Sequence, residues 1–430
     1  MPEINGADTA WVLISAALVL FMTPGLAFFY GGMVRSKNVL GMLMQNFFSM
    51  GLVSVLWVLI GFSLAFGDDI GGGLLGGFDF AGLKDIHMGT PLDALGFGAP
   101  LTIPVLLFMA YQMMFAVITP ALITGATADR LKFAGYATFL GLWLVLVYSP
   151  VAHWVFSPHG WLFKKGALDF AGGTVVHINA GIAALAVVLV IGKRRGWPRD
   201  GMHPHSLPLT LLGTGILWFG WFGFNAGSSL GANGIAAQAF VNTHLAAAAG
   251  MLGWLLVERI KAGHATTLGA ASGAVAGLVA ITPCAGYVGG LSPLVIGFAA
   301  GVVCLLAIGL KTRFGYDDSL DVVGVHLVGG IIGSLMVGLF ADANVNEGIK
   351  GNEGLFFGGG EGLLGKQFLA VAATIAFSGI LSYLLAQLVD KTIGLRVSED
   401  EEIEGLDSSQ HAETAYVLGG IGSMGSGGSA

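Results

Sequence analysis

Two histidines stand at equivalent points of two similar, largely apolar segments. The first segment reads DFAGGTVVHINAGI (169–182) and holds His177; the second reads DSLDVVGVHLVGGI (318–331) and holds His326. Aligned without gaps, the two segments share Asp, Val, His, Gly and Ile. Burial in a membrane-length segment favours the neutral imidazole, which has one donor and one acceptor nitrogen. Two facing rings can hydrogen-bond each other for helix packing, or they can hold or relay a proton.

An aspartate precedes each histidine by eight residues, Asp169 in the first segment and Asp318 in the second. A helix rises about 1.5 Å per residue, which puts each aspartate about 12 Å from its histidine and near a membrane boundary. An aspartate there can cap the N-terminus of a helix. It can also tune a cation site at the mouth of a pore. The spacing favours capping and leaves the second role open.

Aromatic residues and small hydroxyls gather in WFGFNAGSS (221–229), and YQMMF (111–115) offers further aromatic residues. The face of an aromatic ring attracts a cation, so these stretches could line a cation-attracting vestibule. Aromatic residues near a membrane interface also serve as simple anchors. Composition alone does not choose between the two roles.

The composition places these residues in a membrane protein. The chain has 430 residues, of which 55% are hydrophobic and 10% charged, whereas soluble domains carry roughly 25% charged residues. Long runs without Asp, Glu, Lys or Arg allow eleven spans of about 20 residues, the length that crosses the hydrocarbon core. The predicted spans are about 10–32, 40–66, 99–124, 133–153, 170–192, 205–227, 235–257, 266–282, 291–310, 322–341 and 367–389.

The loops predict the orientation of these spans. With the N-terminus outside, 14 of the 19 Lys and Arg residues fall in inner loops and five outside, a clear positive-inside bias. The C-terminus is then inside. The first five spans and the next five run in opposite senses, which is typical of transporters built from inverted repeats. The acidic start of the chain is unlike a secretory signal peptide. The two cysteines, Cys284 and Cys304, lie in predicted spans and exclude a disulfide framework.

We therefore expect an all-α membrane domain over 1–393, followed by two further segments. Repeat one covers about 10–192, repeat two about 205–341, and the eleventh helix about 367–389. The segment 394–416 holds seven acidic residues against one basic residue. It is either a disordered tail or a segment that docks onto basic inner loops such as KRRGWPR (193–199). Residues 417–430 are of low complexity.

Four stretches together resemble the ammonium transporter family (Amt/Mep/Rh), and in particular its Amt branch of bacterial or archaeal type. They are DFAGGTVVHINA, GWFGFNAGS, DVVGVH and GLRVSEDEEIEGLD. The resemblance covers nearly the whole chain, from residue 7 to 416. It implies a homotrimer in the cell membrane, with one pore per subunit and eleven helices in two inverted halves.

The resemblance also implies roles for individual residues. The pore histidines are His177 and His326, and the outer gate is Phe115 and Phe224. The ammonium-binding vestibule holds Ser228, Phe156, Trp221, Gln112 and Asp169. Asp318 is an inner-side structural aspartate. The family usually has a tryptophan where this chain has Phe156, which is a weaker cation–π partner unless Trp154 or Trp161 compensates.

The function that the resemblance implies is transport. Ammonium would bind at the outer site and lose a proton, and ammonia would pass the histidine pair. The alternative is an ammonium sensor that signals through a cytoplasmic partner, and the family suggests a PII-type signal protein at the inner face. We expect the protein to lie in a lipid bilayer. No motif predicts an enzyme, a cofactor, a metal site or a nucleic-acid partner.

Overall fold

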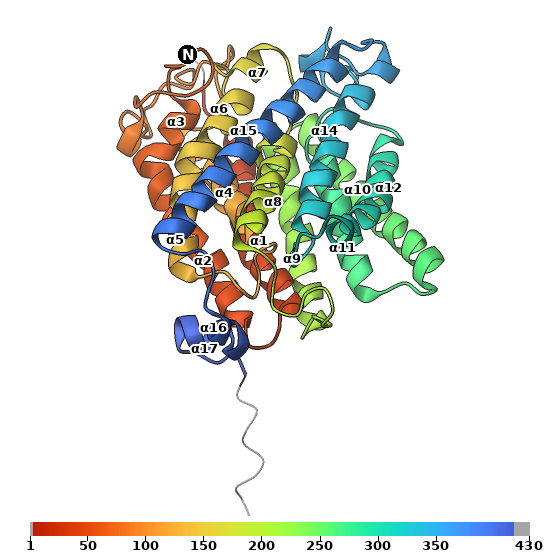
Figure 1. The fold of residues 1–430 in the computed structure, drawn as a ribbon. Helices are drawn as coiled ribbons and strands as arrows, with labels where there is room; N and C mark the ends of the chain where they lie inside the picture. Colours follow the sequence, from red (N-terminus) through yellow and green to blue (C-terminus); the bar gives the residue numbers. More distant parts are fainter. Residues whose placement is uncertain (1–2, 417–430) are drawn as a thin grey trace, which may run out of the picture.

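The described chain is a bundle of helices. The computed structural model describes residues 3–416, so the low-complexity tail predicted for 417–430 lies outside them. Within these residues there are no strands, only two isolated bridges. The long helices lie roughly side by side, and α15 crosses the bundle at a tilt (Figure 1). The predicted all-helical class is confirmed.

The bundle is made of α1 (Gly6–Met33), α2 (Val39–Leu56), α3 (Phe62–Phe66), α4 (Val105–Ile123), α5 (Phe133–Trp143), α6 (Ser149–Phe156), α7 (Trp161–Lys164), α8 (Asn179–Ile191), α9 (Leu207–Ala226), α10 (Gly234–Ala262), α11 (Thr267–Ile281), α12 (Ser292–Ile308), α13 (Leu310–Phe314), α14 (Val328–Phe340) and α15 (Gly362–Thr392). The C-terminal segment adds α16 (Glu399–Glu404) and α17 (Leu406–His411). The π-helical turns are η1 (Trp57–Gly61), η3 (Leu144–Tyr148), η4 (Gly173–Ile178) and η6 (Val323–Leu327). The 3₁₀ turns are η2 (Ala81–Leu83), η5 (Gly227–Ser229), η7 (Glu347–Ile349) and η8 (Leu355–Phe357).

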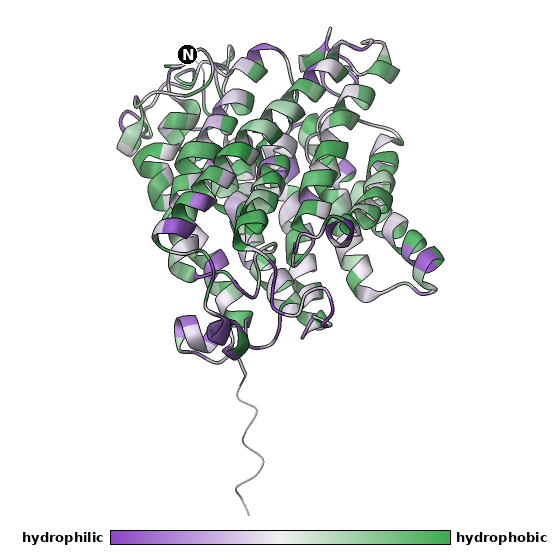
Figure 2. Ribbon diagram, in the orientation of Figure 1, coloured by the Kyte–Doolittle hydropathy of each residue, from purple (hydrophilic) through white to green (hydrophobic). Residues whose placement is uncertain are grey.

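Ten helical segments of the described residues are long and apolar enough to cross a membrane, and each overlaps a predicted span. Hydrophobic residues dominate the bundle, and hydrophilic ones gather mainly towards its two ends (Figure 2). The remaining predicted span, 266–282, forms α11, an apolar helix of 15 residues. Such a helix is about 22 Å long, shorter than the roughly 30 Å hydrocarbon core. The chain is therefore a multi-pass membrane protein with ten full-length segments and one short apolar helix.

The two ends of the bundle differ in character. We call the end that holds residues 67–104 the outer end, following the predicted orientation. The opposite end, which holds α16 and α17, is the inner end (Figure 1). These names are used below for the position of each site.

Buried charges tie the loops together at the inner end. Both Arg194 Nε and Arg194 Nη2 donate to the carboxylate of Asp317, at 2.9 and 2.8 Å. Arg130 donates to the carbonyl oxygen of Asp317 at 2.7 Å and to Ser319 Oγ at 2.7 Å. Burial lowers the pKa of Arg130 to about 10, so this side chain is still charged at neutral pH. The cluster joins loops that precede α5, follow α8 and precede η6.

The acidic C-terminal segment docks on the inner end. Glu402 Oε1 accepts a hydrogen bond from the backbone N–H of Arg195 at 2.8 Å, and Glu402 Oε2 pairs with Arg396 at 2.7 Å. Asp407 Oδ1 accepts from the backbone N–H of Gly41 at 2.8 Å, in the first turn of α2. Glu402 and Asp407 are both buried. The docking interpretation of 394–416 therefore holds, and the interpretation as a disordered tail is wrong.

We predict that Asp317→Ala destabilises the protein by about 3–5 kcal/mol, because it removes the carboxylate that pairs with both buried arginines, Arg194 and Arg130. Arg194 then keeps its longer contact with Asp129, at 3.3 Å. Burial opposes ionisation of Asp317, but the hydrogen bonds and charges of Arg194 and Arg130 outweigh it and hold the pKa of Asp317 below its usual value. The stabilisation is thus present at neutral pH and is lost as the pH falls through that lowered pKa. Thermal unfolding in detergent would measure it.

Asp317→Asn is the matched variant, since it keeps the shape but removes the charge, and it should lose less than Asp317→Ala. An Asp317→Ala protein that unfolds within a degree of the wild type at neutral pH would contradict this account.

Candidate pore and outer vestibule

The two histidines meet inside the bundle. The Nδ1 atoms of His177 and His326 lie 3.2 Å apart, and their rings are nearly parallel with centroids 5.3 Å apart. Their exposed fractions are 1% and 3%. One ring donates and the other accepts in this contact. Among the described residues, the buried Nε2 of His177 has no hydrogen-bond partner, so it is free to bind a small molecule.

Both histidines lie in π-helical turns, His177 in η4 and His326 in η6. A π-helical turn leaves local irregularity in the hydrogen-bond ladder and is often found at functional sites. Each turn continues into a regular helix, α8 or α14. The sequence does not predict that these turns are π-helical. The repeated Asp-to-His spacing indicates only where the two segments lie in the chain.

An aspartate caps each histidine-bearing segment. Asp169 Oδ1 accepts from the backbone N–H groups of Gly172 and Gly173, and Asp169 Oδ2 accepts from those of Thr174 and Val175. Thr174 Oγ1 also donates to Asp169. At the other segment, Asp318 accepts from the N–H groups that begin η6.

The capped ends lie at opposite ends of the pore. Asp169 lines the outer cavity, whereas Asp318 lies next to the inner charge cluster around Asp317. The two segments therefore enter from opposite sides and meet at the histidines.

Two phenylalanine rings separate the histidines from the outer cavity. Phe115 of α4 and Phe224 of α9 have ring centroids 4.4 Å apart and are both buried. Phe115 lines the cavity on the outer side, and Phe224 lines the space on the histidine side. The pair therefore forms a closed apolar barrier between the two spaces.

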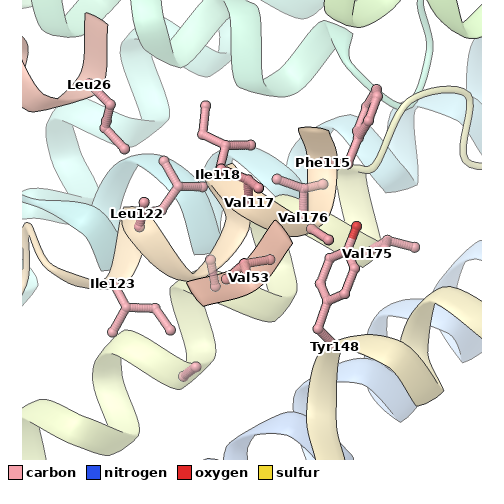
Figure 3. Close-up of a cluster of buried hydrophobic side chains, with 14 of the residues drawn as sticks. Leu26, Val53, Phe115, Val117, Ile118, Leu122, Ile123, Tyr148, Val175 and Val176 are labelled. Carbon is pink, nitrogen blue, oxygen red and sulfur yellow. The ribbon is translucent and has the colours of Figure 1, made fainter. Parts of the chain in front are cut away.

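The space between the barrier and the histidines is small and apolar. It measures about 10 Å³, close to the minimum that holds one water-sized molecule. Ile118 and Leu122 of α4 line it together with Val176, and these side chains point into one buried cluster (Figure 3). A second small space of about 30 Å³ lies on the inner side of His326 and is lined by Asp321 among others.

The outer cavity is much larger, about 380 Å³. Four of the predicted vestibule residues line it: Gln112, Phe156, Asp169 and Ser228. Ser228 Oγ donates to the carbonyl oxygen of Phe224 at 2.8 Å and lies 3.2 Å from Tyr111 Oη. Tyr111 also donates to the end of α9 and fixes the Ser228 turn against α4. Tyr111 carries no separate signal in the sequence, although it is the first residue of YQMMF (111–115).

Trp221 does not line the outer cavity with the other predicted vestibule residues. It lies three residues before Phe224 on α9, one helical turn further inward. Its ring stacks on His177 with centroids 5.6 Å apart, and its Nε1 donates to Thr282 Oγ1 at 2.9 Å. The placement of Trp221 in the vestibule is thus corrected: this tryptophan lines the space below the barrier.

Neither tryptophan that could compensate for Phe156 lines the outer cavity. Trp154 donates to the carbonyl oxygen of Leu74 and packs on Phe377. Trp161 packs edge-on against Trp154, with centroids 5.7 Å apart. Phe156 and Phe163 are therefore the aromatic residues that the segment 154–163 offers to the cavity.

Comparison with known proteins gives a consistent result. The model of the family described as Ammonium Transporter Family matches residues 10–416. An ammonium transporter of Mycobacterium tuberculosis is 53% identical over 431 residues, covering 96% of this chain and 90% of the relative. The crystal structure of Saccharomyces cerevisiae Mep2 has a TM-score of 0.85 at 35% identity, covering 93% and 89%. A structure titled Sensor Amt Protein has a TM-score of 0.84 at 30% identity, covering 94% and 98%.

We predict that Asp169→Asn destabilises the protein by about 1–3 kcal/mol. Both carboxylate oxygens accept backbone hydrogen bonds, and an amide NH₂ would face N–H donors on one side. Thermal unfolding in detergent would measure the loss, with the exposed Asp93→Asn as the control. Equal unfolding temperatures for the two variants would contradict a capping role that depends on both oxygens.

Proposed function

The chain belongs to the ammonium transporter family, and on this basis we propose that it moves ammonium or ammonia through the pore described above. The observation that carries the proposal is the order of the spaces along one path. A wide aromatic cavity comes first, then the phenylalanine barrier, then a space for one small molecule beside two hydrogen-bonded histidines.

In the proposed mechanism, ammonium first binds in the outer cavity. The rings of Phe115 and Phe156 attract the cation, and Ser228 Oγ and the Gln112 side chain offer oxygen acceptors. The bound ammonium then gives a proton to water in the open cavity and becomes ammonia. The barrier and the small apolar space below it favour the neutral molecule, because carrying a bare ion there would cost its hydration.

Ammonia then passes the histidine pair. The free Nε2 of His177 can hydrogen-bond it, and the stacked Trp221 holds the His177 ring in place. Potassium is close to ammonium in charge but has no proton to release. A pore that admits only the neutral molecule therefore excludes alkali cations.

Several further assignments follow from the family and belong to this proposal. We infer a homotrimer with one pore per subunit, in the plasma membrane, with the N-terminus outside. Residues 1–393 would form the membrane domain, with inverted repeats at about 10–192 and 205–341. Residues 394–416 would be its regulatory cytoplasmic segment. The docked acidic segment and the nearby basic loop 193–199 give a PII-type signal protein a charged inner face to bind.

A second candidate function is ammonium sensing, which the likeness to the structure titled Sensor Amt Protein favours. A sensor would bind ammonium in the same cavity and signal through a separate cytoplasmic partner. Flux through the purified protein separates the two functions.

Uptake of methylammonium into proteoliposomes tests the transport proposal. The wild type should accumulate it. His177→Ala should slow uptake about tenfold, because it removes roughly one hydrogen bond to the passing ammonia. Phe224→Ala should let potassium compete with methylammonium uptake, because it removes one ring of the apolar barrier between the outer cavity and the histidines. Phe222→Ala is the matched control on α9, since Phe222 stacks on Phe240, 4.0 Å away, and lines neither space. A folded wild-type protein that moves no methylammonium would end the transport proposal.

A separate hypothesis concerns the proton that ammonium releases. The hydrogen-bonded histidine pair supports a route by which this proton follows the ammonia, so that each cycle carries one net charge. An ammonium pulse on a solid-supported membrane should then give a transient current in the wild type and none in His177→Ala. Full ammonia flux without any current in the wild type would rule the hypothesis out.

A further inference from the structure

The outer cavity of this chain contains a lysine. Of the residues that line it, only Asp169 and Lys350 are charged. Both carboxylate oxygens of Asp169 are occupied by the backbone N–H groups of residues 172–175. Asp169 is also buried, whereas Lys350 is exposed, so Lys350 is the solvent-accessible charge of this lining. This is unexpected for a cavity that recruits a cation.

The backbone around Lys350 is fixed at the rim of the cavity. The N–H of Lys350 donates to the carbonyl oxygen of Glu347, and the side chain of Ile349 is buried beside it. Asn352 Nδ2 donates to the carbonyl oxygen of Gly166 across the rim at 2.8 Å. Lys366 Nζ in turn donates to Asn352 Oδ1 at 2.6 Å. The segment is therefore held from both sides, and Lys350 is kept at the entrance.

Within the described residues, no carboxylate forms an ion pair with Lys350. The charge of Lys350 interacts with that of Glu353, whose Oε1 accepts from the backbone N–H of Gly351 at 3.0 Å. Glu353 is partly exposed to water and offsets the lysine only partly, because water and dissolved ions screen such a charge. Glu347 is also exposed on the same turn.

We propose that Lys350 sets how weakly the outer cavity recruits ammonium, by placing a like charge at the entrance. This rests on the proposed transport function and deepens it. Two unit charges a few ångströms to about 10 Å apart in water change an equilibrium by about twofold to fivefold. The effect acts through space and is screened as the ionic strength rises, since the Debye length falls from about 10 Å at 0.1 M to about 3 Å at 1 M.

The lysine acts on ammonium but not on ammonia. Its field raises the free energy of the bound ion and leaves the neutral molecule beyond the barrier unchanged. Removing the charge therefore stabilises the bound ion alone, which lowers KM and also lowers the maximal rate. A merely structural role of Lys350 would not give this split or its dependence on salt.

Phe156 limits recruitment of the cation by a separate physical effect. It is half-buried on the cavity wall, and its single ring is a weaker cation–π partner than the larger tryptophan ring. A cation–π contact acts at short range and is little affected by dissolved salt. The two causes of weak recruitment can therefore be separated by experiment.

The test is methylammonium uptake into proteoliposomes at about 0.01 M and about 0.5 M ionic strength, equal on both sides. At low salt, Lys350→Gln should lower KM about twofold or more with a lower maximal rate, and Lys350→Glu should lower KM further. Lys350→Arg should match the wild type, and Glu353→Gln should raise KM. At high salt these differences should vanish, whereas Phe156→Trp should lower KM about twofold at both salt concentrations.

Lys84→Gln is the matched control, because Lys84 is exposed at the outer end but does not line the cavity. The proposal is overturned if Lys350→Gln and Lys350→Glu leave KM unchanged at low salt, or if Lys350→Arg shifts KM as much as they do. These outcomes require a wild type that transports. If the wild type itself takes up no methylammonium, the proposed transport function fails. That result differs from a transporting wild type in which the Lys350 variants leave KM unchanged.

Discussion

The hydrogen bond between His177 and His326 is the interaction on which the rest of the arrangement depends. A polar ring deep in an apolar bundle needs a partner, because lipid and apolar side chains offer none. Here each ring partners the other at 3.2 Å, and this contact links the segments that begin at Asp169 and Asp318. The capping, the π-helical turns and the stacking of Trp221 together hold the two rings within hydrogen-bonding distance of each other.

From this contact outward, polarity increases in steps. The space beside the histidines holds about one small molecule and is lined almost wholly by apolar side chains. Beyond the phenylalanine barrier, the outer cavity offers hydroxyl, amide and charged groups over a much larger volume. Such a gradient sorts solutes by the cost of removing their hydration before it sorts them by size. Recognition and passage are thus separate tasks, carried out by different residues on either side of Phe115 and Phe224.

Much of this architecture could be predicted from the sequence because membrane spans leave a strong compositional signal. The histidine pair was accessible through the echo between two segments 149 residues apart. The bounds of α11 were accessible too, since the predicted span 266–282 and the helix Thr267–Ile281 differ by one residue at each end. Trp221 was misplaced since its position depends on the exact rotation of α9 about the barrier. The sequence did not indicate that Lys350 lines the outer cavity, because the fold of the whole chain decides which loop residues reach a cavity.

The docked C-terminal segment has a consequence for the order in which the protein can be completed. The residue before α2, Asn38, makes no capping hydrogen bond to that helix; its amide oxygen instead accepts the backbone N–H of Leu406. The cap comes from Asp407, which is 366 residues away from the Gly41 N–H that it binds. A growing chain therefore inserts α2 with an open amide group at its inner end, and that group gains its partner only after Asp407 has been made. The inner surface around α2 is thereby completed by a segment that is made long after the helix it caps.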